Sequence, residues 1–476
     1  MDPGLKILTA KESQYCDQQT ALLESMNEHD LMERAAIRLF QHICKQNEGN
    51  APLHIICGPG NNGGDGLCIA ALAAATGLRT RVSLCCFGKQ MSPAMQFRLK
   101  QHKDFQPLQI IEINNPDELN IQQDEIIIDA MFGTGLNSAL QQPWDGLVAK
   151  INEAKVAVYS IDMPSGLFDN QPQSAAPYVN ARLTLTVQAP KPTFFHPENN
   201  IVFEVVDCGI NTDAITSSRY YLDPEYPPVI HQLKQLLPAR PKHSHKGSFG
   251  HTLIIGGNYG MHGAAAIAAK ACYDAGSGLT TVIAPSEATA HLSQLPGIMH
   301  KASALNKDAA DLIQPDKYNS LAIGPGLGQT PETTALLTAI LYKWQHPMVI
   351  DADALNIISK NLHLLEMVPA GSILTPHPKE CERLFGPFNN SKEREFRLLQ
   401  IAKKYNIYIL AKDTYSLLAC PEGNAFYNGT GSPKLARGGS GDKLTGMIAG
   451  LYAQSGVPRN AALAGMYFAG SEFTII

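Results

Sequence analysis

Short apolar runs alternate with helical patterns through both halves of the chain. Continuous apolar strands separated by helices are typical of parallel sheets that are covered on both faces. The expected strands are residues 53–57, 81–87, 126–129, 156–162, 183–187 and 201–206, then 252–255, 279–284, 321–323, 348–351, 372–374 and 407–410. The pattern therefore predicts an α/β protein with two domains.

A proline-rich stretch separates the two sets of strands. Residues 223–228 read Asp-Pro-Glu-Tyr-Pro-Pro, and residues 238–242 read Pro-Ala-Arg-Pro-Lys. Because prolines interrupt helices and strands, this composition indicates a connection between domains. We predict a first domain over residues 1–220, a linker over residues 221–240 and a second domain over residues 241–476.

A glycine-rich loop follows the first expected strand. Residues 58–66 read Gly-Pro-Gly-Asn-Asn-Gly-Gly-Asp-Gly, and a helix is expected over residues 67–75. The glycines match the G-x-G-x-x-G pattern, but the next strand ends without the acid that a dinucleotide fingerprint needs. We therefore expect the loop to surround a ligand phosphate or an ion with its backbone and amide groups.

Two further strands of the first half end in aspartate. Asp129 precedes a Gly-Thr-Gly turn at residues 133–135, and Asp162 precedes Pro-Ser-Gly at residues 164–166. Each aspartate alone is equally well explained as a turn or cap residue. Because ligands bind at the carboxyl ends of strands in open α/β sheets, the three loops should converge. Asn62, Asp129 and Ser165 offer only oxygen ligands, which suit a hard cation rather than zinc or copper.

The second half carries a glycine turn at residues 438–441 that leads into an apolar helical pattern over residues 444–452. Backbone N–H groups of such a turn, together with the positive end of a helix, bind phosphate. Asp442 is placed to take a proton from a hydroxyl that attacks the phosphate. The alternative is a tight turn in which Asp442 is only the N-cap of the helix.

Other polar loops follow the remaining strands of the second half. His377 lies between two prolines, and we favour ligand contact over loop packing for its side chain. Asp351 and Asp353 follow another strand, and one of them is explained equally well as the cap of the next helix.

Composition restricts the class of protein. Hydrophobic residues make up 44% and charged residues 17% of the 476 positions, as in soluble globular proteins. The net charge of −5 argues against nucleic acid as a partner. The 10 cysteines form no Cys-x-x-Cys pair, which predicts reduced thiols and a cytoplasmic location. We expect no signal peptide at the N-terminus and no membrane contact, since no apolar run approaches about 20 residues.

These motifs occur together, in order, in one known family. Over nearly its whole length the chain resembles the bifunctional NAD(P)H-hydrate repair enzymes. The resemblance rests on residues 31–35, 61–65, 129–135 and 162–166 in the first half, and on residues 245–247, 324–328, 351–356, 375–378 and 439–442 in the second. It implies a Rossmann-like three-layer sandwich that interconverts the R and S hydrates of NADH and NADPH. It also implies a ribokinase-like α/β domain that dehydrates the S hydrate with ADP in bacterial members, or ATP in eukaryotic ones.

The resemblance further implies which residues bind. Potassium would be held by Asn62, Asp129 and Ser165. The hydrates NADHX and NADPHX would contact Asn61, Asn62, Gly63, Gly64, Asp65, Gly133, Thr134, Gly135, Leu136, Asn137, Ser138, Ala139 and Asp162, and in the second half Gly326, His377 and Asp442. The nucleotide, with Mg²⁺, would contact Lys412, Asp413, Thr414, Tyr415, Ser416, Ser432, Pro433, Lys434, Leu435, Ala436, Arg437, Gly438, Gly439, Ser440 and Gly441. We assign acid–base catalysis of epimerisation to Asp162 and the general base of dehydration to Asp442.

The chain departs from the family pattern at a few positions. Asp413 replaces a usual glycine, and an acid there would face the nucleotide. Lys434 and Arg437 replace small or uncharged residues and would strengthen phosphate binding, and Lys379 replaces a glycine. The chain also ends at Ile476, earlier than expected, so a last helix of the second domain is expected to be missing.

Two alternatives remain open at this point. The first is a ribokinase-type small-molecule kinase, for which a stable phosphorylated product would be evidence. The second is that the first half is a non-catalytic binding domain, although such a scaffold would need neither Asp129 nor Asp162. We expect a homo-oligomer in either case.

Overall fold

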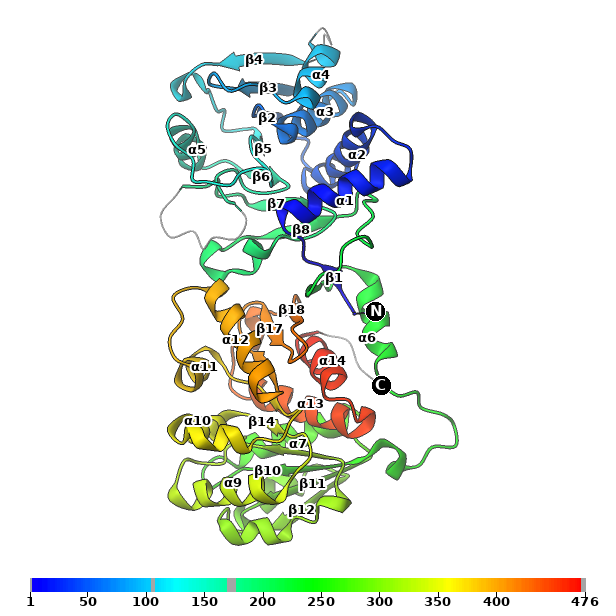
Figure 1. Ribbon diagram of the computed structural model, residues 1–476, viewed down its shortest axis with the longest axis vertical. Helices are drawn as coiled ribbons and strands as arrows, with labels where there is room; N and C mark the ends of the chain where they lie inside the picture. The colour runs from blue at the N-terminus through cyan, green and yellow to red at the C-terminus, as the bar shows by residue number, and fades with distance from the viewer. Residues whose placement is uncertain (1, 104–107, 169–176, 472–476) are drawn as a thin grey trace. The chain divides into compact units, whose positions relative to one another are not determined.

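The computed structural model describes residues 2–103, 108–168 and 177–471, and it divides into two compact units (Figure 1). The first unit comprises Lys6–Ser217, and the second comprises Met1–Leu5 with Ser218–Ile476. Each unit is built around its own sheet, so the expected α/β class with two domains is confirmed. No helix among the described residues is both long and apolar enough to cross a membrane.

The first unit contains a 7-stranded parallel sheet in the order β4-β3-β2-β5-β6-β7-β8. Its strands are β2 (Leu53–Cys57), β3 (Thr80–Cys85), β4 (Gln109–Ile113), β5 (Ile126–Ala130), β6 (Val158–Ile161), β7 (Leu183–Val187) and β8 (Phe203–Val206). Its helices are α1 (Ala10–Leu23), α2 (Glu28–Gln46), α3 (Asn61–Ala75), α4 (Pro93–His102) and α5 (Trp144–Glu153). The strand order reverses between β2 and β5, and at such a switch point open α/β sheets bind their ligands.

Both faces of this sheet are covered, which makes the three layers that the resemblance implied. Ile55 of β2 packs into a core with residues of α2 and α3, whereas the neighbouring Ile56 packs into a second core with α5. This alternation follows from the pleat of a strand, which points successive side chains to opposite faces.

Helix α3 begins at Asn61, six residues earlier than the expected start at residue 67. Glycines of residues 58–66 therefore allow close packing of the helix start more than they form a flexible loop. A Cβ at Gly63 would lie 2.0 Å from the Gly58 carbonyl oxygen, and a Cβ at Gly66 would lie 2.6 Å from the Ala130 Cβ. The first turn of α3 can approach β2 and β5 only because these side chains are absent.

The second unit contains an 11-stranded sheet in the order β1-β9-β18-β17-β16-β15-β14-β13-β10-β11-β12. Its strands are β1 (Leu5–Lys6), β9 (Arg219–Leu222), β10 (His251–Ile255), β11 (Leu279–Ala284), β12 (Ile298–Ala302), β13 (Ser320–Ile323), β14 (Val349–Ile350), β15 (Ile373–Leu374), β16 (Tyr408–Ala411), β17 (Ser416–Ala419) and β18 (Ala425–Asn428). The six strands expected in this half correspond to β10, β11, β13, β14, β15 and β16 and are parallel, as predicted, whereas β17, which was not expected, runs antiparallel to both β16 and β18. The connections between β16, β17 and β18 are too short for the crossover that parallel strands need.

Helices cover the sheet of the second unit and enclose its main core. They are α6 (Pro227–Gln235), α7 (His262–Asp274), α8 (Thr289–Leu292), α9 (Pro331–Lys343), α10 (Ala352–Lys360), α11 (Pro378–Phe385), α12 (Ser391–Tyr405), α13 (Ser440–Ser455) and α14 (Pro458–Gly470). Helices α7, α13 and α14 contribute most helical residues of that core. Residues 472–476, on which the expectation of a missing last helix depends, lie outside the described residues.

Residues 221–240, which were predicted to be a linker, belong to the second unit. They include the end of β9 and helix α6, whose Val229 and Leu233 are fully buried in the core of the second unit. Pro227 and Pro228 begin α6, where a missing backbone N–H costs nothing. The functional limits of residues 1–220 and 241–476 stay predictions.

Candidate active sites

In the first unit, the loops after β2, β5 and β6 converge on Asp162, as predicted. The Asp162 Oδ2 atom accepts a hydrogen bond of 3.2 Å from the Thr134 backbone N–H. A Cβ at Gly133 would lie 3.0 Å from that oxygen and 3.4 Å from the Asn62 Oδ1 atom. Asp162 also has a left-handed backbone with φ of +63°, a conformation that costs free energy in a residue other than glycine. Such strain is common where a side chain must be aimed at a ligand.

Lys191 is a site residue that sequence reasoning did not single out. Its side chain is 1% exposed, and its Nζ atom lies 3.3 Å from the Asp162 Oδ1 atom. The same ammonium donates to the Ala189 carbonyl oxygen at 2.8 Å and to the Thr186 hydroxyl at 3.3 Å. A buried ammonium needs such partners, so it holds the Asp162 carboxylate in place. The sequence did contain a signal for this residue, because Lys191 lies between two prolines shortly after an apolar strand.

Two further carboxyl groups have perturbed acidity near Asp162. Partial loss of hydration, together with the Asp162 charge, raises the pKa of Asp17 to about 6, although the residue is exposed on α1. The same causes raise the pKa of Asp65 well above its usual range. Groups that hold a proton near neutral pH are suited to acid–base chemistry. Asp65 was expected at this site, whereas Asp17 of α1 was not.

Asp129 and Ser165 form the centre of the expected cation site. The Asp129 Oδ1 atom accepts from the Ser165 hydroxyl at 2.5 Å, and its Oδ2 atom accepts from the Ser165 N–H and the Ser160 hydroxyl, both at 2.8 Å. Burial raises the pKa of Asp129 even though these donors oppose the shift. The Ser165 hydroxyl also lies 3.3 Å from the Phe132 carbonyl oxygen.

This set fits a hard cation by the chemistry of its donors, because carbonyl, hydroxyl and carboxylate oxygens line it. Asn62 is buried, but no hydrogen bond joins it to Asp129 or Ser165, and its Nδ2 atom has no partner among the described residues. Within the same residues, no group of three or more His, Cys, Asp or Glu side chains could hold a metal. The expected cation site contains only one carboxylate, that of Asp129. It therefore differs from a metal site built from several His, Cys, Asp or Glu side chains.

Other residues of the predicted substrate set have different surroundings. Asn61 is exposed and donates to the Glu28 carboxylate at 3.2 Å. Asn137, Ser138 and Ala139 lie on the exposed part of the loop that begins at Gly133. A Cβ at Gly64 would lie 3.0 Å from the Met32 sulfur, so packing against α2 explains this glycine.

In the second unit, the glycine turn and the start of α13 have the geometry of a phosphate site. Gly439, with φ of +89°, is the N-cap of α13, and Asp442 lies in the first turn. The alternative in which Asp442 is the N-cap is therefore wrong. Burial, followed by the charge of Asp351, raises the pKa of Asp442, while Lys412 opposes the shift. A carboxylate with raised pKa is a stronger base.

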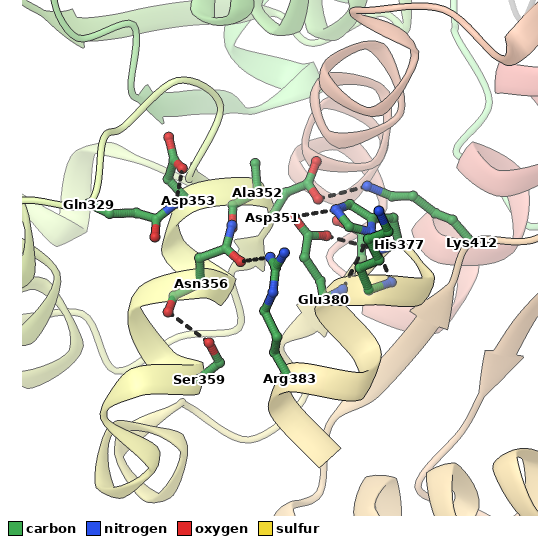
Figure 2. A network of polar contacts seen from close by, with 12 residues as sticks. Gln329, Asp351, Ala352, Asp353, Asn356, Ser359, His377, Glu380, Arg383 and Lys412 are labelled. Atoms are coloured by element: carbon green, nitrogen blue, oxygen red, sulfur yellow. Dashed lines mark hydrogen bonds and ion pairs between the residues drawn. The ribbon is translucent and has the colours of Figure 1, made fainter. Parts of the chain in front are cut away.

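A network of polar contacts links residues that follow neighbouring strands of the sheet in the second unit (Figure 2). Asp351 follows β14, and its Oδ1 atom accepts from the Lys412 ammonium at 2.7 Å. Asp353 accepts from the Gly328 N–H at 2.8 Å and from Gln329 at 2.9 Å, so it shapes the loop after β13. Asp351 occupies the N-cap position of α10, but its side chain does not cap the helix. The sequence left open whether one of these aspartates caps the next helix. The structure instead pairs Asp351 with Lys412, and Asp353 with Gly328 and Gln329.

His377 is the N-cap of α11. Its Nδ1 atom accepts from the backbone N–H of Lys379 at 3.1 Å and of Glu380 at 3.4 Å. Its Nε2 atom lies 3.3 Å from the Glu380 carboxylate, and 45% of the side chain is exposed. Loss of hydration, with the Lys412 charge next, lowers the pKa of His377. The structure thus explains the histidine as a cap, while ligand contact stays a prediction.

The glycine loop after β13 approaches the start of α7 closely. Gly326 has φ of +57°, and a Cβ there would lie 2.7 Å from the Met261 carbonyl oxygen. Only glycine fits this position without a shift of the backbone. Packing therefore accounts for Gly326, and its predicted contact with the hydrate is untested.

The two predicted nucleotide segments lie side by side, since a Cβ at Gly441 would be 3.2 Å from the Lys412 Nζ atom. Asp413 was expected to face the nucleotide with its negative charge. Its carboxylate instead pairs with Arg394 at 2.5 Å and accepts from the Thr414 N–H at 2.8 Å. Its negative charge is therefore compensated within the protein. Lys434 and Arg437 are exposed beside the turn.

Two family models match the chain. One, described as YjeF-related protein N-terminus, matches residues 28–193, and the other, described as NAD(P)H-hydrate dehydratase, matches residues 252–472. The bifunctional NAD(P)H-hydrate repair enzyme of Moorella thermoacetica is 32% identical over 467 residues, which cover 93% of this chain and 87% of that protein. The chain belongs to the family of bifunctional NAD(P)H-hydrate repair enzymes. The relative from Coxiella burnetii is 33% identical over 457 residues, which cover 94% of this chain and 90% of that protein.

Family membership confirms the resemblance read from the motifs. Among solved structures, the chain is similar to the ADP/ATP-dependent NAD(P)H-hydrate dehydratase of Bacillus subtilis, which was co-crystallised with ATP and Mg²⁺. The identity is 30%, the TM-score is 0.45, and the match covers 50% of this chain and 85% of that one.

Proposed function

We propose that this protein repairs hydrated nicotinamide cofactors with two active sites. The first unit interconverts the R and S hydrates of NADH and NADPH, and the second dehydrates the S hydrate at the expense of a nucleotide. The observation that carries the proposal is that one chain of this family has Asp162 after β6, the strand next to β5 at the switch point of the first sheet, and Asp442 behind a glycine turn in the second unit.

Epimerisation follows from the chemistry of the substrate, in which the hydroxyl-bearing C6 carbon is bonded to the ring nitrogen. When the C6–O bond breaks and the oxygen leaves as water, the nitrogen lone pair stabilises a planar cation at C6. Water that adds to the other face, and gives up a proton, inverts the centre. Asp162 exchanges these protons, and Lys191 together with the Thr134 N–H holds its carboxylate.

A potassium ion held by Asn62, Asp129 and Ser165 would supply a fixed positive charge for the diphosphate of the substrate. The support for this ion is the oxygen lining of the site and the burial of Asp129. A buried carboxylate is costly unless a cation or hydrogen bonds compensate it.

Dehydration proceeds through phosphate transfer. Asp442 takes the proton of the C6 hydroxyl, and the oxygen attacks the terminal phosphorus while the bond to the bridging oxygen of the nucleotide breaks. The turn at residues 438–441, with Lys412, stabilises the charge on the phosphoryl group. The nitrogen lone pair then expels phosphate, and loss of a C5 proton restores the ring double bond. We propose ADP with Mg²⁺ as the donor, with ATP as the alternative.

Location and assembly are further parts of the proposal. All 10 cysteines are free thiols, which supports a reducing, cytoplasmic environment. A homo-oligomer remains expected from the sequence.

The test starts from a mixture of R and S hydrates with Mg²⁺ and either ADP or ATP. Recovery of the reduced-nicotinamide absorbance from both epimers, with release of inorganic phosphate, would support both activities. Recovery from the S epimer alone would remove the epimerase from the proposal. A stable phosphorylated product without absorbance gain would identify a kinase instead.

A further inference from the structure

Asp351 is a buried carboxylate that lies outside the predicted set of binding and catalytic residues. It is 1% exposed and follows β14 at the carboxyl edge of the sheet in the second unit. A buried carboxylate must be paired, because the loss of its hydration costs several kcal/mol. Both of its oxygens have a partner, and both partners border the glycine turn.

The first partner is Lys412, which follows β16. The Lys412 Nζ atom donates to the Asp351 Oδ1 atom at 2.7 Å (Figure 2). A Cβ at Gly441 would lie 3.2 Å from the Lys412 Nζ atom and 3.7 Å from the Asp351 Oδ2 atom. The ammonium therefore lies directly against the first turn of α13, and 21% of the lysine side chain remains exposed.

The second partner is Thr445, one turn along α13 from Gly441. Its hydroxyl donates to the Asp351 Oδ2 atom at 2.6 Å, and its side chain is fully buried. Asp351 thus joins the end of β16 to the helix that carries Asp442. The ion pair with Asp351 fixes where the Lys412 ammonium lies relative to the glycine turn.

We propose that Asp351 is the positioning residue for phosphate transfer, which holds the Lys412 ammonium at the turn for the terminal phosphate and keeps it from pairing with Asp442. This inference rests on the function proposed for the second unit. Without Asp351, the flexible Lys412 side chain would be free to pair with Asp442, whose pKa it already lowers. That pairing would neutralise the base and remove a phosphate ligand together.

The charges around Asp442 agree with this arrangement. Three charged groups face it: Asp351 and Asp353 raise its pKa, and Lys412 lowers it. Loss of the Asp351 charge would lower the pKa of Asp442, and a released Lys412 would lower it further. Both consequences move the pKa in one direction, so the sign of the expected change is unambiguous.

Asp351→Asn removes the charge at nearly constant size, and Thr445→Val is the matched control that removes one hydrogen bond but keeps the charge. Binding of ADP with Mg²⁺ to the full chain is measured by calorimetry, without turnover. The Asn variant should bind about 10-fold more weakly, the scale of one misplaced charged contact. The Val variant should bind within about 2-fold of the original protein.

A double-mutant cycle separates positioning from general destabilisation. If Asp351 acts through Lys412, Lys412→Met and Asp351→Asn together should weaken ADP binding no more than Lys412→Met alone. Additive losses would overturn the proposal, as would unchanged affinity in the Asn variant. These measurements decide the question even if the chain shows no dehydration at all, so the two proposals fail separately.

The pH profile of dehydration gives a second readout that a merely structural role would not move. In Asp351→Asn, the acidic limb of kcat/KM should shift to lower pH by roughly one unit, and kcat should fall. Thr445→Val should leave the limb in place. An unshifted limb in an Asn variant that still dehydrates the S hydrate would refute the effect on Asp442.

Discussion

Asp442→Asn tests the mechanism of the second unit most directly. The carboxylate lies in the first turn of α13, but Gly439 is the N-cap, and no residue that the structure describes donates a hydrogen bond to Asp442. The amide therefore replaces the carboxylate without losing a hydrogen bond. Removal of the charge forfeits its interaction with the positive end of the helix, which is worth about 0.3–1 kcal/mol.

An opposite effect offsets this loss. Because the pKa of Asp442 in the folded protein is raised above 3.8, the folded state pays a cost to ionise it. That cost is absent at pH values below both the folded and unfolded pKa, grows as the pH rises between them, and is fully present above both. Near neutral pH the Asn variant escapes this cost, so its melting temperature should stay nearly unchanged.

Activity should respond very differently, because an amide cannot accept a proton. Loss of a general base lowers the rate by about 100-fold or more, and 100-fold corresponds to about 2.7 kcal/mol of transition-state stabilisation. The assay follows dehydration of pure S hydrate with Mg²⁺ and ADP, with ADP affinity and the melting temperature measured on the same samples. Epimerisation by the first unit is the internal control and should continue. Near-full dehydration by a folded Asn variant would mean that Asp442 is not the base.

Three other predictions concern the cation, the donor and packing. Asp129→Ala should abolish epimerisation and spare dehydration of pure S hydrate, whereas equal loss of both activities in rate assays would point to misfolding. ADP should support faster turnover of S hydrate than ATP in parallel initial-rate measurements, and a clear preference for ATP would contradict this. Gly66→Ala places a Cβ 2.6 Å from the Ala130 Cβ and should destabilise the first unit by about 1–3 kcal/mol in urea unfolding. Gly49→Ala, which meets nothing within 4 Å, is its control, and equal effects of the two would refute the packing argument.

Most strands that sequence reasoning found are central strands buried on both faces, although the edge strand β8 was also found and the buried hairpin of β17 and β18 was missed. The expected strands at residues 183–187 and 279–284 coincide with β7 and β11 because a central parallel strand needs apolar residues at nearly every position. The edge strands β4 and β12 were missed. Both lie at the ends of their sheets, and most of their residues are at least partly exposed, so they lack the continuous apolar run.

The convergence of Asn62, Gly133 and Asp162 was predictable, because parallel strands end at the same edge of a sheet. Lys191 and Asp351 were not assigned to the sites. Each acts through a partner that is distant in sequence or on another strand: Lys191 lies 29 residues from Asp162, and Asp351 lies 61 residues from Lys412. No local pattern encodes such a pairing.

The sequence by itself determined the α/β class, the family and the loops that carry the chemistry, because these depend on local composition and on the order of motifs. The tertiary structure decided which carboxylates are paired and which remain available as bases. It also placed residues 221–240 in the second unit, since Val229 and Leu233 find a core there. Burial and pairing depend on neighbours that only the folded chain brings within a few ångströms, and these neighbours set the charge and the position of each catalytic side chain.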